Sequence, residues 1–251
     1  NSLLHFWLPV FVIVLLILPS NLSTAFLLFG NVLMLAFIAS YPLKYLISII
    51  ILGLISLLIF ISLARTFPEI FPNRIDTWIN RIENFKTGES TDGNYQLSRA
   101  KTAIVSGKLL GLGAGKSRMK NFLPQSSSDF IYAIIVEEFG LIGGVALILL
   151  YVLLLYRIVV ISYRTKSSFG KLTVIGLGVP VVTQAFANIG VALQVIPVTG
   201  QNLPMISSGG TSAWVTCIAM GIILSVSSKI ESDNDLSTEN NNPLNVLSEI
   251  H

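Results

Sequence analysis

Residues 43–64 read LKYLISIIILGLISLLIFISLA, in which Lys44 is the only charged residue. A helix needs about 20 consecutive apolar residues to cross the hydrocarbon core of a bilayer. Over the whole chain 53% of the residues are hydrophobic and 12% are charged, about half the charged share of a soluble domain. Five further runs of this kind lie near residues 3–19, 22–40, 140–157, 172–193 and 211–228. The sequence therefore predicts an all-α polytopic membrane protein with six transmembrane helices, because core helices of a soluble protein would need more polar faces.

The six runs also predict the organisation of the chain. Residues 1–64 hold three transmembrane helices, residues 65–139 form one large external loop, and residues 140–230 hold three more helices with an external loop at 194–210. The tail at 231–251 is rich in Asn, Asp, Glu and Ser, so we expect it to be disordered. Short basic loops stay in the cytoplasm. The connection between the fourth and fifth runs has no acid and four cations, so we expect both chain ends to be cytoplasmic; these cations are Arg157, Arg164, Lys166 and Lys171.

Composition excludes several kinds of active site. Cys217 is the single cysteine, so no disulfide can form within the chain. His5 and His251 are the only histidines, which argues against a histidine-based metal site or a Ser-His-Asp triad. No protein metal site is therefore predicted. The net charge of +3 is small and gives no indication of nucleic-acid binding.

Residues 111–130, GLGAGKSRMKNFLPQSSSDF, contain a glycine stretch that looks like a phosphate-binding loop. It is not a Walker A loop, because that motif needs glycine where this chain has Leu110, and the expected side of the membrane has no ATP. Three cations follow the glycines, namely Lys116, Arg118 and Lys120. Free backbone N–H groups beside cations suit a phosphate or pyrophosphate. The alternative is a solvated patch that faces lipid headgroups.

Carboxylates follow this stretch where the membrane is expected to begin. Asp129 could be a general base toward a sugar hydroxyl, or it could cap the helix that starts at FIYAII. Glu137 and Glu138 would be costly inside the hydrocarbon, and a straight helix over 130–157 would run about 42 Å, which is too long for one span. We therefore expect residues 130–138 to dip at the interface or line a cavity, and Gly140 to mark a break.

Two further segments of the external side are informative. Residues 95–110 have helical periodicity, with Leu97, Ala100 and Ile104 on one face, and could form an interfacial helix or an ordinary surface helix. In the second external loop and the run before it, polar residues collect where hydrocarbon is expected: Asn188, Gln194, Thr199, Ser207 and Ser208. Irregular backbone at this depth is tolerated when it lines a wet cavity. A plain turn between two spans is the alternative.

Three stretches resemble the FtsW/RodA/SpoVE (SEDS) family of bacterial membrane proteins. They are YQ…A…SG…GLG at 95–113, LPQSSSDFIYAIIVEEFGLIGG at 123–144 and NIG…PVTGQNLPMISSGGTS at 188–212. Members of this family have ten spans and polymerise peptidoglycan glycan strands from lipid II. The chain begins at Asn1 rather than methionine, and its six runs match the last six spans, so we expect the first four to be missing. The residue pattern of the third stretch, P-V-T-G-x-x-L-P-x-I-S-x-G-G, resembles FtsW more than RodA.

The resemblance implies an inverting glycosyl transfer that releases undecaprenyl pyrophosphate. The required aspartate of the family corresponds to Asp129, while a family lysine falls near Met119, between Arg118 and Lys120. Lys116, Arg118, Lys120 or a divalent cation, Mg or Mn, would stabilise the pyrophosphate. The other substrate-binding residues that we predict are Gln96, Glu137, Glu138, Asn188, Thr199, Gly200 and Ser207.

The resemblance also implies partners and a location. The family works in the bacterial cytoplasmic membrane with a class B penicillin-binding protein transpeptidase and with other division or elongation proteins. Two alternatives stay open at this point. A lipid II flippase or other permease would spread its acids through the membrane depth and would break helices in paired positions. A non-catalytic division scaffold would make Asp129 dispensable.

Overall fold

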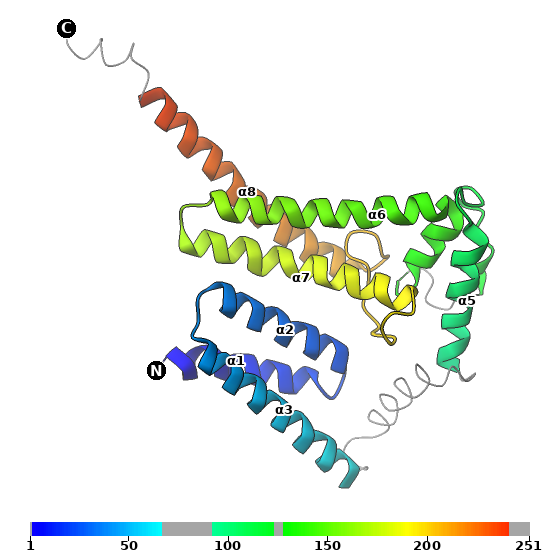
Figure 1. Ribbon diagram of the computed structural model, residues 1–251, viewed down its shortest axis with the longest axis horizontal. Coiled ribbons are helices and arrows are strands. Elements are labelled where there is room, and N and C mark those ends of the chain that lie inside the picture. Colours follow the sequence, from blue (N-terminus) through cyan, green and yellow to red (C-terminus); the bar gives the residue numbers. More distant parts are fainter. Residues whose placement is uncertain (1, 67–91, 123–127, 241–251) are drawn as a thin grey trace.

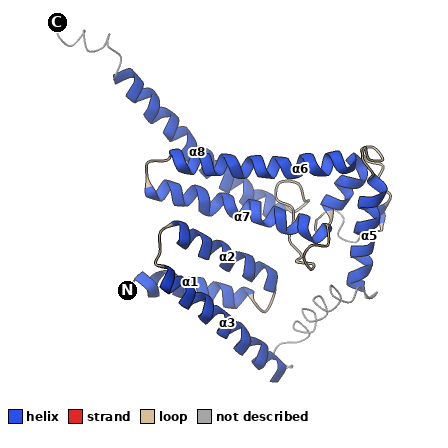
Figure 2. Cartoon of the chain, in the orientation of Figure 1, coloured by secondary structure: helices blue, strands red, loops and turns tan. Residues whose placement is uncertain are grey.

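The computed structural model describes residues 2–66, 92–122 and 128–240, and all regular secondary structure in these ranges is helical (Figure 2). Each of the six predicted apolar runs forms a helix, and a further helix precedes the glycine stretch. The all-α prediction is therefore confirmed for the described residues. The helices are α1 Ser2–Ile17, α2 Leu22–Ile38, α3 Leu43–Thr66, α5 Asp92–Gly107, α6 Ile131–Arg164, α7 Ser168–Ala192 and α8 Gly210–Asn240, with a 3-10 turn at Met119–Asn121.

Four of these helices are long and apolar enough to cross a membrane. They are α3 over Leu43–Leu63, α6, α7, and α8 over Gly210–Ile230. The first two helices are apolar but shorter, and the 17 residues of α2 extend about 26 Å against a hydrocarbon core of about 30 Å. The tight turn between them ends at Asn21, whose side chain caps α2 by accepting a hydrogen bond of 3.1 Å from Thr24 N. The chain is thus a multi-pass membrane protein in which the first helical hairpin is short.

The helices form two groups, which Figure 1 shows one above the other. The first group is α1, α2 and α3. In the second group α6 and α7 run antiparallel, α8 packs against α7, and α5 stands across one end of α6. The groups meet through α2 and α7, where Thr183 Oγ1 donates to Asn31 Oδ1 at 3.2 Å.

Close packing of α7 against α6 depends on a missing side chain. Val174 and Ala185 of α7 are fully buried, and Ile158 of α6 is almost so. A Cβ atom at Gly178 would come within 2.6 Å of the Ile158 side chain, so glycine is required for this approach. The two helices therefore form a stable core on which the loops at one end of the bundle can be fixed.

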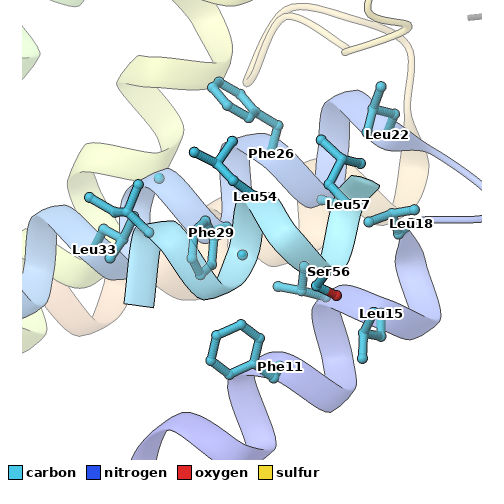
Figure 3. Close-up of a pocket in the computed structure, with 15 residues that line it drawn as sticks. Phe11, Leu15, Leu18, Leu22, Phe26, Phe29, Leu33, Leu54, Ser56 and Leu57 are labelled. Carbon is cyan, nitrogen blue, oxygen red and sulfur yellow. The ribbon is translucent and has the colours of Figure 1, made fainter. Parts of the chain in front are cut away.

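A cleft of about 260 Å³ lies among α1, α2 and α3 (Figure 3). Its walls are almost wholly apolar, with Phe11, Phe29 and Leu54 among the lining side chains and Ser56 as a polar exception. None of the lining residues is titratable. This cleft therefore offers no group for acid–base chemistry, and the candidate site must be sought at the loops beside α5, α6 and α7.

The last helix continues past its apolar part. It remains helical through residues 231–240, which the sequence had assigned to a disordered tail, so that boundary was wrong. No glycine or proline lies between Gly221 and Pro243, and a helix already formed by the apolar part can propagate into a polar segment that lacks a breaker. Residues 241–251 lie outside the described part of the chain.

Candidate functional site

The site is built around a break in α6. Gly140 has φ 72° and ψ −173°, which divides the helix into a first limb at residues 131–139 and a long spanning limb at 141–164. The break confirms the prediction made from the excessive length of the run and from its two acids. A broken helix leaves carbonyl and amide groups without their usual partners, and at membrane depth these must be satisfied by protein.

The glycine stretch satisfies the carbonyls at the break. Glu137 O and Glu138 O would normally accept bonds from the next turn of the helix. Here they accept from Leu112 N and Gly113 N, both at 2.9 Å. Because Gly111 N donates to Gly107 O at 2.7 Å, three successive amides of the stretch are used within the protein. The prediction that the glycine backbone offers free N–H groups to a phosphate was therefore wrong for residues 111–113.

The same segment satisfies the amides on the far side of the break. Leu141 N donates to Lys108 O at 2.9 Å, and Ile142 N donates to Leu109 O at 3.4 Å. The segment at residues 107–113 thus replaces the missing turn of α6 in both directions. We call it the bridging segment.

Three glycines make this approach possible. A Cβ atom at Gly107 would lie 2.0 Å from Val136 O, and one at Gly111 would lie 2.2 Å from Glu138 O. A Cβ at Gly140 would lie 2.2 Å from Leu109 O. Such distances are impossible for any residue with a side chain. The glycines of this region therefore serve close backbone packing.

The three predicted cations lie on a turn that follows the bridging segment. Lys116, Arg118 and Lys120 are all exposed, and we call residues 116–120 the basic turn. Beneath it lies Glu137, which is completely buried. The carboxylate of Glu137 accepts hydrogen bonds from Ser117 Oγ at 2.5 Å, Arg118 N at 3.1 Å and Met119 N at 3.3 Å, and Ser106 Oγ lies 3.4 Å from its Oε1. The substrate contact predicted for Glu137 stays untested, while its oxygen atoms are engaged by the protein.

Asp129 lies directly before α6 and is half-buried. The N-cap residue of the helix is Phe130, and its side chain makes no capping hydrogen bond. The capping position predicted as an alternative for Asp129 is therefore occupied by its neighbour. Gly200, with φ 66°, approaches from the second external loop, and a Cβ atom there would lie 3.7 Å from Asp129 Oδ2. The structure thus brings these two predicted site residues together.

Asn188 and Ser207 fix the main chain around Asp129. Asn188, only 1% exposed, donates from Nδ2 to Asp129 O at 2.8 Å and to Gln201 O at 2.6 Å. Ser207 Oγ donates to Ser128 O at 2.7 Å and accepts from Leu203 N at 2.8 Å. Both bridges join the second external loop to the segment before α6. These two predicted residues therefore act on the backbone next to the candidate base.

Other side chains that the sequence reasoning missed hold the same loop. Gln201 Nε2 donates to Thr24 Oγ1 of α2 at 2.7 Å, Gln184 Nε2 of α7 donates to Asn202 O at 3.1 Å, and Tyr151 OH of α6 donates to Pro204 O at 2.5 Å. Gln184 could have been singled out, because a polar amide within an apolar span usually has a specific partner. The loop is thus anchored to three helices of both groups.

The remaining predicted residues are placed as follows. Gln96 of α5 and Glu138 are half-buried. Thr199 Oγ1 and Asn188 Oδ1 are buried, and neither has a hydrogen-bond partner among the residues that the structure describes. Within the described ranges no three side chains of His, Cys, Asp or Glu gather where they could hold a metal ion, and the prediction of a divalent cation stays untested. The predicted helix at 95–110 is α5, and its buried face, which includes Ala100 and Ala103, packs against the first limb of α6.

Comparisons with known proteins agree with this arrangement. The chain is 34% identical over 216 residues to "Probable peptidoglycan glycosyltransferase FtsW" of Nitrosococcus halophilus, covering 84% of this chain and 54% of that protein. It is 34% identical over 208 residues to "Stage V sporulation protein E" of Bacillus subtilis, covering 82% of this chain and 54% of the relative. The chain therefore spans about half the length of these curated relatives.

A solved structure has the same fold. It comes from work described as "Structural coordination of polymerization and crosslinking by a peptidoglycan synthase complex", and the match has a TM-score of 0.66 with 24% sequence identity. The match covers 89% of this chain and 60% of the other. In addition, the family model FTSW_RODA_SPOVE, described as "Cell cycle protein", matches residues 2–232. The chain therefore belongs to the FtsW/RodA/SpoVE family of cell cycle proteins.

Proposed function

We propose that this chain belongs to a peptidoglycan glycosyltransferase that polymerises glycan strands from lipid II in the bacterial cytoplasmic membrane. The observation that carries the proposal is the placement of Asp129 at one end of the membrane-spanning helices. Its main chain is held by Asn188, and its carboxylate lies beside the backbone of Gly200. Relatives named as probable peptidoglycan glycosyltransferases support the same reaction.

The proposed reaction joins two lipid-linked sugars with inversion. The Asp129 carboxylate accepts the proton of the GlcNAc 4-hydroxyl of one lipid II while the oxygen attacks the anomeric carbon of the other. The new glycosidic bond forms as the bond to undecaprenyl pyrophosphate breaks, and the bonding electrons leave with the pyrophosphate. Lys116, Arg118 and Lys120 then stabilise the charge that develops on this leaving group. A divalent cation could assist them.

The geometry around Asp129 suits a base that must not move. A general base acts when its oxygen lies about 2.6–3.2 Å from the oxygen that carries the proton, or reaches it through one water. Asn188 fixes the carbonyl of Asp129 itself, and Ser207 fixes the preceding carbonyl of Ser128. A positioned base and two membrane-anchored reactants supply much of the rate by orientation.

Further parts of the proposal follow from the family. A class B penicillin-binding protein transpeptidase would be the partner that cross-links the strands, and other division or elongation proteins would join them. The description of the solved relative, a complex that coordinates polymerization and crosslinking, supports this partnership. The basic connection between α6 and α7, at residues 165–167, would lie in the cytoplasm, and Asp129 would lie on the outer side.

The test is polymerisation of labelled lipid II by the complete protein that contains this chain and by its Asp129→Asn variant, in detergent with the cognate transpeptidase present. Asparagine has nearly the same shape but cannot accept the proton, so we expect the rate to fall by about 10²–10⁴-fold. Lys166→Gln removes an exposed charge from the opposite end of the bundle and serves as the control with parental activity. Equal product from parent and Asp129→Asn, or none from either, would instead support lipid II translocation or a scaffold role.

A further inference from the structure

Glu137 is a completely buried carboxylate, and its polar contacts within the described part of the chain come from α5 and the basic turn. Burying a carboxylate is strongly unfavourable unless hydrogen-bond donors replace the water that it loses. Two of these donors are backbone amides, those of Arg118 and Met119, and therefore do not depend on which side chains the turn carries. The position of the carboxylate and the conformation of the turn are thus coupled.

Ser117 extends this contact by one further bond. Its hydroxyl donates to Glu137 Oε2 at 2.5 Å and accepts from Lys120 N at 3.1 Å. A chain of hydrogen bonds therefore runs from the amide of Lys120 through the hydroxyl to the carboxylate. Hydrogen bonds to a charged acceptor are shorter and stronger than neutral ones. This chain of hydrogen bonds closes the turn around the buried Glu137 carboxylate.

Ser106 provides a useful contrast on the other side of the same carboxylate. Its hydroxyl has one proton, which it donates to Ala103 O at 2.8 Å. The contact with Glu137 Oε1 is 3.4 Å and competes for that proton. The shorter bond therefore keeps it, and Ser106 contributes little to the position of Glu137.

We infer that Glu137 is a positioning residue whose buried carboxylate holds the basic turn in one conformation and thereby presents its exposed cations to a phosphate-bearing ligand. Under the proposed function, on which this inference rests, that ligand is the pyrophosphate of a lipid-linked sugar. Glu137 itself need not touch the ligand. The cation side chains lie on the exposed surface of the turn, while the carboxylate binds its backbone from beneath.

The inference is tested first by hydrogen exchange of residues 116–122 in lipid nanodiscs, which needs no catalytic activity. In Glu137→Gln the side-chain NH2 group would point at hydrogen-bond donors of the basic turn. In Ser117→Ala the hydroxyl that links Lys120 N to the Glu137 carboxylate is removed. We expect the amides of Arg118, Met119 and Lys120 to exchange about 10-fold faster or more in both variants. Ser117→Thr keeps the hydroxyl and should restore the parental rate, and Ser106→Ala should retain it.

The second measurement is steady-state polymerisation of lipid II by the same variants with the transpeptidase present. A displaced turn weakens ligand binding, so KM should rise by about 10–100-fold while kcat changes much less. Parental exchange in both Glu137→Gln and Ser117→Ala would overturn the inference, as would faster exchange with an unchanged KM. If the parent protein is inactive but the variants show the expected exchange rates, the proposed function is refuted. The role of Glu137 in fixing the conformation of the basic turn would then still stand.

Discussion

Asn188 shows how one side chain can fix a candidate base through its main chain. Its Nδ2 group donates to Asp129 O and to Gln201 O, which belong to segments far apart in the sequence. Because the residue is almost completely buried, water cannot replace either bond. This amide group, together with the Ser207 bridge, therefore sets the separation between the segment before α6 and the second external loop.

Asn188→Asp is expected to separate these two segments. The substitution preserves the shape but places a carboxylate against two carbonyl oxygens, and each buried group left without a partner costs about 1–3 kcal/mol. We expect a lower thermal midpoint and a fall in polymerisation of about 10²-fold, as a displacement of the base by about 1 Å would produce. Differential scanning fluorimetry and the lipid II assay measure the two effects.

Asn21→Asp is the matched control, because Asn21 caps α2 by accepting from Thr24 N and aspartate caps equally well. The same drop in both variants would mean that added charge, rather than the lost clamp, is responsible. Parental activity and stability of Asn188→Asp would show that the two hydrogen bonds are unimportant.

Residue-level prediction from sequence succeeded where polar groups stand in apolar surroundings. Asn188 and Ser207 were singled out on that ground, and both hold the main chain beside Asp129. The role of Glu137 could not be read from the sequence, since its donors lie 18 to 20 positions away in a turn without periodicity. Ser117 was not predicted, because a serine between two cations carries no pattern that indicates a buried partner.

The broken helix α6 is the element that organises the end of the bundle where the candidate site lies. Its length and its acids predicted a break at Gly140, which the φ of 72° confirms. Sequence periodicity could not predict what satisfies the break, because the bridging segment pairs through backbone atoms that every residue has. The glycine stretch resembles a phosphate-binding loop in sequence, but its glycines allow the close backbone approach that this pairing needs.

Gly140→Ala is expected to destabilise the protein. A residue with a side chain is strained at this φ by about 1–3 kcal/mol, and the new Cβ would also collide with Leu109 O. Thermal unfolding in nanodiscs should show a clear drop in midpoint. Gly221→Ala is the control, because its Cβ would meet no atom within 4 Å and alanine favours a helix by about 0.5–1 kcal/mol. A Gly140→Ala variant as stable as the parent would contradict the described backbone.

At the scale of the whole molecule, the candidate site depends on both helical groups. Gln201 Nε2 reaches Thr24 Oγ1 of the short first hairpin, and the same loop is bonded to Gln184 of α7 and Tyr151 of α6. The order of the apolar helices was predictable from hydrophobic runs. Contact between the first hairpin and the second external loop was not, because 177 positions separate its two residues.

Thr24→Val should loosen the second external loop without unfolding the protein. Valine keeps the shape but removes the acceptor of the bond from Gln201, which is worth about 0.5–1.5 kcal/mol. We expect faster hydrogen exchange in residues 197–209 and little change elsewhere. Thr173→Val is the control, because the hydroxyl of Thr173 is exposed and bonds Phe169 O within its own helix. Unchanged exchange in Thr24→Val would show that the loop does not depend on the first hairpin.

The bridging segment at residues 107–113 precedes α6 in the chain, and this order matters during biosynthesis. Ribosomes deliver a protein from its N-terminus, at about 5–20 residues per second. The backbone groups that complete the break at Gly140 have therefore already been synthesised when the broken helix emerges. The backbone groups at the break in α6 can thus find their hydrogen-bond partners as the helix enters the bilayer. With the reverse order along the chain, these polar groups would enter the hydrocarbon before their partners had been synthesised.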